Sequence, residues 1–191
     1  MNDGRFFEKT LSSQTVYEGK IVHLYKDTVL LPNGKEGIRE HIRHVGAACV
    51  VPLTANYEVL LVRQFRYPFS AVLTEIPAGK LDGKNEDPYE AALRELREET
   101  GANANELVDL GVFYPTCAYT DERIHMYLAL DVAPGEQALD EDEFVEYELV
   151  PIGTLVDRIM NGELPDGKTQ TAVLKAYLYL RRIGRIPSIQ G

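Results

Sequence analysis

The sequence has few cysteines, no long apolar run and a shortage of positive charge. Its two cysteines, Cys49 in an apolar run and Cys117 in a predicted loop, show no metal-ligand spacing, and we interpret both as reduced thiols. No apolar stretch approaches the roughly 20 residues of a membrane span, and MNDGRFFEKT at the N-terminus lacks the features of a signal peptide. These absences predict a cytoplasmic protein without a membrane partner.

The charge balance is acidic, with 30 Asp and Glu against 20 Lys and Arg and a formal net charge of -10. Nucleic-acid binding depends on cationic neutralisation of phosphates, so we expect no nucleic-acid partner. An anionic small ligand is compatible with this charge if arginines or a divalent cation offset the field of the protein. The length of 191 residues and the 45% hydrophobic content indicate one main globular domain, with room for a small extra sheet.

The chain alternates apolar and polar residues in its first part and turns to apolar runs after that. Residues 15–44 indicate two strands around a turn at Pro32-Asn33-Gly34. Residues 46–53 and 57–65 are β-branched apolar runs that predict a hairpin inside a buried mixed sheet. We expect further strands at 107–114, 123–131 and 144–150 and helices at 151–161 and 169–182. Together with a central helix, this pattern predicts an α+β sandwich.

The central helix has clear start and stop signals. Asp87 is a good N-cap, Pro88 suits the first helical position, and Gly101 provides a left-handed C-terminal cap. Glu90 stands three residues after the cap, as in a capping box. Helical periodicity separates an apolar face from a ridge that carries three carboxylates, those of Glu95, Glu98 and Glu99.

The acidic ridge has two interpretations. It can be a solvated face balanced by Arg94 and Arg97, or it can be a site for a divalent cation, because carboxylates are the hard oxygen donors that magnesium prefers. The helix alone does not separate these alternatives.

The loop and the helix together resemble the signature of the Nudix hydrolases. Glu86 is followed by seven residues and then by Arg-Glu-Leu-Arg-Glu-Glu-Thr-Gly-Ala at 94–102, which matches the signature throughout. Gly79 matches its glycine, although six residues instead of the usual five separate Gly79 from Glu86. The resemblance implies a Nudix-type α/β/α sandwich with a mixed central sheet and an N-terminal antiparallel segment.

The resemblance also implies hydrolysis of a pyrophosphate bond that depends on magnesium, with manganese as the alternative. The implied metal ligands are Glu95, Glu98, Glu99 and the carbonyl of Ala78. Glu98 and Arg94 are the catalytic candidates on the helix, with Arg94 orienting the carboxylates through an ion pair that includes Glu86.

The flanking segments narrow the resemblance to the ADP-ribose pyrophosphatase branch. They include 38–53, 61–69, 75–81, 114–130 and 162–169. Pro115 marks ADP-ribose-type substrates in that branch, although Thr116-Cys117-Ala118 departs from its usual Pro-Gly. The resemblance assigns Arg39, Arg66 and Glu75 to substrate binding. Taken alone, Arg66 can equally form a salt bridge at the rim, and alternation does not say which face Arg39 occupies.

A second acidic segment, DEDEFVEYE at 140–148, has the spacing of a calcium loop but has Val145 where an EF-hand needs glycine. It is either a solvated loop or, as the resemblance implies, a source of catalytic carboxylates. We expect Glu143 to be a metal ligand and Glu141 to be the general base.

Two classes of function remain. The chain hydrolyses ADP-ribose or another nucleoside diphosphate sugar such as GDP-mannose, or it is a non-catalytic Nudix module that senses such a nucleotide. Intact Glu95, Glu98 and Glu99 favour hydrolysis. We expect two units, an N-terminal β segment at 1–45 and a hydrolase domain at 46–191. The branch uses such a segment to complete each active site across a twofold axis, so we expect a homodimer.

Overall fold

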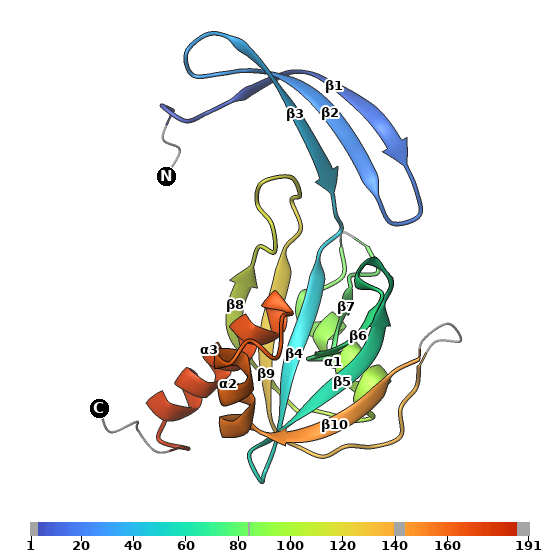
Figure 1. Cartoon of the computed structure of the whole chain (residues 1–191), viewed down its shortest axis with the longest axis vertical. Coiled ribbons are helices and arrows are strands. Elements are labelled where there is room, and N and C mark those ends of the chain that lie inside the picture. Colours follow the sequence, from blue (N-terminus) through green and yellow to red (C-terminus); the bar gives the residue numbers. More distant parts are fainter. Residues whose placement is uncertain (1–3, 84, 140–143, 187–191) are drawn as a thin grey trace.

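The computed structural model describes residues 4–83, 85–139 and 144–186, which form two sheets and three α-helices (Figure 1). The N-terminal sheet is antiparallel and has the order β1 (Lys9–Glu18), β2 (His23–Leu30) and β3 (Glu36–Arg43). The predicted turn at Pro32-Asn33-Gly34 lies between β2 and β3, and Gly34 has φ of 79°. The sheet has one more strand than the sequence predicted, because β1 begins at Lys9 and a second turn is closed by the bond from Gly19 N to Val22 O.

The larger sheet is mixed, as predicted. Its order is β10-β5-β4-β9-β8, with β6 beside β5 and β7 beside β4. Strands β4 and β9 are parallel, and the other pairs are antiparallel. The strands are β4 (Ala47–Thr54), β5 (Glu58–Arg66), β6 (Ala71–Glu75), β7 (Ala78–Lys80), β8 (Leu107–Phe113), β9 (Ile124–Val132) and β10 (Glu146–Pro151), and a short 3₁₀ helix (Tyr67–Phe69) joins β5 to β6.

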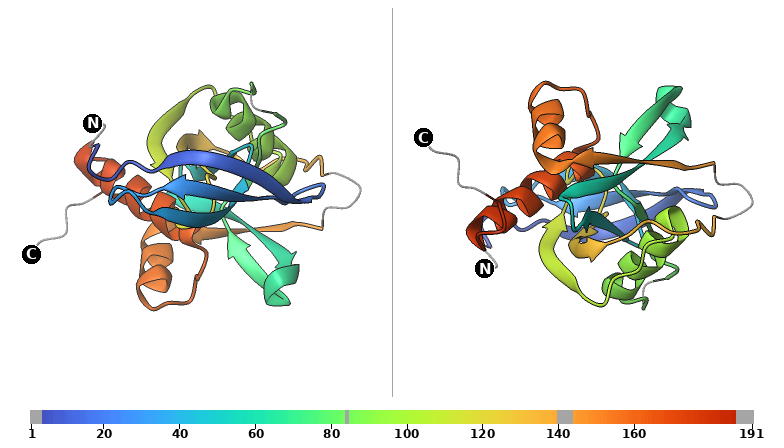
Figure 2. Two further views of the ribbon diagram at one scale, coloured as in Figure 1. Left: turned by 90° about the horizontal axis from the view of Figure 1, so that it is seen from above. Right: turned by 90° about the horizontal axis from the view of Figure 1, so that it is seen from below.

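Helices cover both faces of this sheet. Every residue of β4 is buried, and alternate residues enter different cores. Cys49 and Val51 pack with α2 (Ile152–Met160) and α3 (Gly167–Arg182), whereas Ala48 and Val50 pack with α1 (Pro88–Thr100). Viewed along the long axis, α2 and α3 lie on one side of the sheet and α1 lies on the other (Figure 2). The predicted α/β/α sandwich is confirmed.

The predicted hairpin of β4 and β5 is only partly formed. The two strands pair at Leu53 and Val59, and from Val62 onward β5 pairs with β6 instead, while β10 pairs with residues 58–63 of β5. The freed edge of β4 pairs with β7, within a segment that the sequence predicted to be loop. The chain between β6 and β7 therefore lies where β4 and β5 separate.

Among the described residues, no helix has both the length and the apolar composition needed to cross a membrane.

Candidate active site

The acidic helix α1 begins and ends where the sequence predicted. The Asp87 side chain accepts a hydrogen bond from Tyr89 N at 2.9 Å, and Pro88 is the first helical residue. At the other end, Gly101 has φ of 67° and donates its N–H to the carbonyl of Arg97. Ala92 and Leu96 are fully buried against the sheet. These local signals fix the rotation of the helix and hence the direction of its carboxylates.

Two of the three ridge carboxylates are buried. Glu95 is 7% exposed and Glu99 is 3% exposed, so these two residues do not form a solvated face. Arg94 Nη1 donates to Glu95 Oε1 at 2.7 Å and to Glu98 Oε2 at 3.2 Å. Its Nε donates to Glu86 Oε1 at 3.3 Å, which confirms the predicted ion pair. Burial would lower the pKa of the Arg94 guanidinium, but Glu86 and Glu95 outweigh it and raise the pKa. Arg94 therefore compensates the repulsion between the glutamates.

Strand β7 packs directly against this ridge. Ala78 N donates to Glu99 Oε2 at 3.0 Å. Gly79 approaches Glu95 so closely that a Cβ atom at residue 79 would overlap the Glu95 carboxylate. The loop that follows anchors Glu86, because Asp82 N donates to Glu86 Oε2. That hydrogen bond lowers the pKa of Glu86. Glycine at residue 79 is thus a steric requirement of the ridge.

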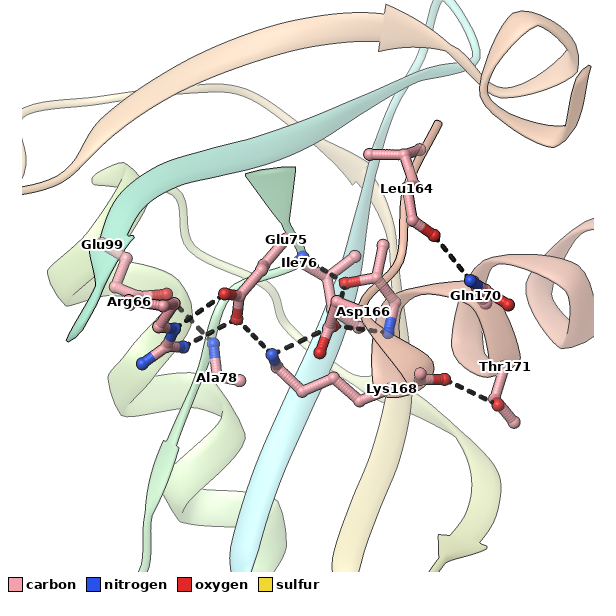
Figure 3. A network of polar contacts seen from close by, with 12 residues as sticks. Arg66, Glu75, Ile76, Ala78, Glu99, Leu164, Asp166, Lys168, Gln170 and Thr171 are labelled. Carbon is pink, nitrogen blue, oxygen red and sulfur yellow. Dashed lines mark hydrogen bonds and ion pairs between the residues drawn. The ribbon is translucent and has the colours of Figure 1, made fainter. Parts of the chain in front are cut away.

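A second charged group, which we call the wall, consists of Arg66, Glu75, Asp166 and Lys168, and its Arg66 lies beside Glu99 of the ridge (Figure 3). Arg66, at the end of β5, binds both oxygens of Glu75 at 2.7 Å. Lys168 Nζ also donates to Glu75 Oε2, and it binds Asp166 Oδ2 at 3.0 Å. Burial would raise the pKa of Glu75, which is 1% exposed, but Arg66 and Lys168 outweigh it and lower the pKa. The Glu75 bond in turn raises the pKa of Arg66.

One pocket of about 790 Å³ joins the two groups. Its lining contains six carboxylates and four cationic side chains, an excess of two negative charges. The predicted site residues that line it are Arg66, Ala78, Arg94, Glu95, Glu98, Glu99 and Pro115. An anionic ligand would therefore meet net repulsion here unless cations accompany it.

Four predicted site residues are not among the described residues that line this pocket. Glu75 lies behind Arg66 and Lys168 and binds both of them. Arg39 is on β3, outside the pocket of its own chain, and binds both oxygens of Glu8 at 2.8 and 2.5 Å. Glu141 and Glu143 fall outside the described residues. The functional roles of all these residues stay predictions.

The sequence assigned no role to Asp166, Lys168 and Glu122, which also line the pocket. Asp166 is the N-cap of α3 and accepts a hydrogen bond from Thr169 N at 2.9 Å. The signal available in the sequence was Asp-Gly-Lys at a helix start. This signal predicts the cap but cannot place Lys168 beside Glu75, 93 residues away.

Carboxylates and a nearby backbone carbonyl match magnesium in chemical class. Among the described residues, however, no three His, Cys, Asp or Glu side chains are already arranged to hold a metal ion. In this arrangement Glu95 and Glu98 bind Arg94, and Glu99 binds the N–H of Ala78. The donor types fit a hard divalent cation, and the carboxylates would have to turn toward it. Metal ligation stays a prediction.

Comparison with known proteins agrees with this geometry. The NUDIX domain matches residues 42–170, and the nucleoside diphosphate sugar hydrolase N-terminal domain matches residues 8–42. An ADP-ribose pyrophosphatase of Bacillus subtilis is 41% identical, over 91% of this chain and 94% of the relative. A methanol dehydrogenase activator of Bacillus methanolicus is 40% identical, over 92% of this chain and 95% of the relative.

More distant similarity extends to other named hydrolases and to a solved structure. A GDP-mannose pyrophosphatase of Yersinia enterocolitica is 32% identical, over 78% of this chain and 83% of the relative. The crystal structure of an ADP compounds hydrolase superposes with a TM-score of 0.83 at 23% identity, covering 94% of this chain and 97% of the other, and supports the fold. The family models, the relatives and the acidic helix of the pocket agree that this chain belongs to the Nudix hydrolase family.

Proposed function

We propose that this chain hydrolyses the pyrophosphate bond of ADP-ribose or of a closely related nucleoside diphosphate sugar, with magnesium as cofactor. The observation that carries the proposal is a pocket lined both by the Nudix glutamates and by the cations Arg66 and Lys168. The names of the relatives support the substrate class, since two of them are pyrophosphatases of ADP-ribose and GDP-mannose.

The residues of the pocket have distinct parts in the proposed reaction. Water adds to one phosphorus, the bond from that phosphorus to the bridging oxygen breaks, and the two products are a nucleoside monophosphate and a sugar phosphate. Glu95, Glu98, Glu99 and the carbonyl of Ala78 would hold magnesium, which would neutralise the pyrophosphate charge and lower the pKa of a bound water. Arg94 orients the glutamates, and Arg66 binds a phosphate oxygen.

The test is product analysis on the full chain. With ADP-ribose and magnesium, we expect AMP and ribose 5-phosphate in equal amounts, and we expect EDTA to abolish their release. A panel that includes GDP-mannose, scored by kcat/KM, assigns the preferred base and sugar. If ADP-ribose binds but neither compound is hydrolysed with magnesium or manganese present, the chain is a sensing module and the proposal is wrong.

A second candidate function has a specific observation in its favour. The methanol dehydrogenase activator is almost as similar to this chain as the ADP-ribose pyrophosphatase is, and it covers the same share of the chain within one percentage point. Regulation of a dehydrogenase is therefore a candidate beside hydrolysis. Adding the wild-type chain and a hydrolysis-deficient Glu99→Gln variant to a purified alcohol dehydrogenase would separate the two. Activation by both proteins would show regulation that does not need turnover.

We also propose that the protein is a homodimer joined through its N-terminal sheet. The sheet stands at one end of the molecule, and every residue of β1 is exposed (Figure 1). Exposed apolar residues of this segment include Leu11, Val16, Tyr17, Ile21, Val22 and Ile38. A three-stranded sheet needs an apolar face that is covered to be stable, and a second copy would cover it. Arg39 could then serve the pocket of the other copy.

Oligomeric state and activity test the dimer together. Sedimentation of the wild-type chain at micromolar concentration should give twice the monomer mass. Val16→Lys, which places a charge among these exposed apolar residues, should shift the mass toward the monomer and lower turnover. A fully active monomeric wild type would contradict the proposal. We propose a cytoplasmic location as well, because the thiols of Cys49 and Cys117 are free and free thiols are typical of reducing compartments.

A further inference from the structure

Lys168 occupies a helix position where a positive charge is unfavourable. Asp166 caps α3, Gly167 follows it, and Lys168 is the second residue of the helix. The first turn of a helix has the positive end of its dipole, which favours acidic side chains and disfavours lysine. A residue that breaks a local rule of this kind is often placed for function. The contacts of Lys168 show what offsets the unfavourable position.

Two carboxylates hold the ammonium of Lys168. Nζ donates to Glu75 Oε2 and to Asp166 Oδ2, the second at 3.0 Å, and the side chain is 11% exposed. An ammonium has three N–H donors. Within the part of the chain that the structure describes, the third donor has no protein partner, and Lys168 lines the pocket. One donor is therefore available to a ligand in the pocket.

Arg66 and Lys168 are held side by side by the same atom. Arg66 Nη2 donates to Glu75 Oε2 at 2.7 Å, and Lys168 Nζ donates to that same oxygen (Figure 3). The Glu75 side chain is 2% exposed and so is a fixed counter-ion. The next residue is fixed as well, because Ile76 N donates to Thr169 Oγ1 at 3.0 Å in α3. The separation of the two cations is thus set before any ligand arrives.

We propose that Lys168 is a substrate-binding residue which, together with Arg66, binds one phosphate of the substrate, and that Asp166 is the positioning residue for Lys168. This inference rests on the proposed function, since the ligand is a phosphate of the nucleoside diphosphate sugar. Adjacent oxygens of one phosphate can accept hydrogen bonds from two neighbouring cations, and such charge-assisted bonds are strong. The phosphate binds beside these two cations, and the rest of the diphosphate extends toward the glutamates of α1.

Kinetics of three lysine variants test the substrate contact. Lys168→Met keeps the apolar stem and removes the charge, and we expect the KM for ADP-ribose to rise by about 10- to 100-fold while kcat stays within about threefold. Lys168→Arg restores a cationic donor and should recover most of the affinity. The matched control is Lys175→Met, an exposed lysine on the same helix outside the pocket lining, which should match the wild type.

The asparagine variant of Asp166 tests the positioning role separately. Asparagine is as good an N-cap as aspartate, so Asp166→Asn should keep α3 and the melting temperature while loosening the hold on Lys168. We expect KM to rise by about three- to tenfold with unchanged kcat. This variant also keeps the test informative if Lys168→Met does not fold.

The outcomes separate this inference from the proposed function. If the wild type hydrolyses ADP-ribose and Lys168→Met has the wild-type KM, or loses only kcat, the substrate contact is refuted. If the wild type hydrolyses nothing, the proposed function fails, and calorimetry with ADP-ribose and magnesium decides about Lys168. A Kd raised at least tenfold in Lys168→Met would support the contact, whereas equal Kd values or no binding by the wild type would overturn it.

Discussion

Gly79→Ala is the substitution whose effect follows most directly from the structure. A methyl carbon at residue 79 would lie 2.5 Å or less from both carboxylate oxygens of Glu95. Ordinary contacts between such atoms are about 3.5 Å. The carboxylate must therefore retreat by about 1 Å or more. It cannot retreat freely, because Arg94 holds Glu95 Oε1 at 2.7 Å.

The expected loss follows from that displacement. Overpacking of this kind destabilises a protein by about 1–3 kcal/mol. A misplacement of about 1 Å in a catalytic group can lower turnover by about 100-fold, which corresponds to about 2.7 kcal/mol in the barrier. The assay is magnesium-dependent release of AMP from ADP-ribose, measured together with the thermal unfolding midpoint. We expect a large fall in kcat and a modest fall in Tm.

Gly83→Ala, four residues further along the chain in the loop after β7, is the matched control. Nothing lies within 4 Å of the position that its Cβ would take, and its backbone does not require glycine. Both kcat and Tm should stay close to the wild type. If Gly79→Ala retained wild-type turnover, or if the two alanine variants lost activity equally, the packing of β7 on Glu95 would not matter for catalysis.

The other predictions concern the charges of the pocket and the two thiols. Glu99→Gln can still accept the Ala78 N–H, so its stability should change by less than about 1 kcal/mol, but the lost charge should lower turnover by at least about 100-fold. Glu90→Gln, at an exposed residue in the first turn of the same helix, should keep turnover within a few-fold of the wild type. Equal turnover in the two variants would exclude the ridge as the metal site. The folded-state pKa of Glu75 is lowered, so its ion pairs stabilise the fold above pH 4.5 and lose that effect as the pH falls through the folded pKa. Urea unfolding of Glu75→Gln should therefore show a deficit of about 3 kcal/mol at pH 7 that shrinks below pH 4.5, and a constant deficit would contradict this. Burial raises the pKa of the Cys49 thiol to about 12, so a disulfide reagent at pH 8 should modify the exposed Cys117 quickly and Cys49 only after unfolding.

Local signals in the sequence were sufficient for the acidic helix. Asp87, Pro88 and Gly101 act within one turn of the positions that they determine, so the start and end of α1 were predicted correctly. The same applies to β4 and β5, whose apolar runs are long. Strand β7 has only three residues and no alternation, and it forms because the separating β4 leaves an edge to pair with. Such a strand depends on tertiary structure and has no signal of its own.

The charged group of Arg66, Glu75, Asp166 and Lys168 depends on contacts between distant parts of the chain. The sequence left two alternatives for Arg66, a substrate contact or a salt bridge. The structure shows that Arg66 forms a salt bridge with Glu75 and also lines the pocket. Arg39 binds Glu8, 31 residues away, which lies just before the strand that the sequence did not predict. Alternation gives the face of a strand but not the element that will cover it. Pairs of this kind become visible only in the folded chain.

The two sides of the pocket differ in how their charge is balanced. On the wall, Arg66 and Lys168 face Glu75 and Asp166, so the four charges cancel. On the ridge, one arginine faces several glutamates, and the pocket keeps its negative excess. A neutral wall can orient a diphosphate but cannot overcome repulsion from the ridge. Under the proposed function, magnesium and substrate must therefore each strengthen the binding of the other, by the same factor in both directions.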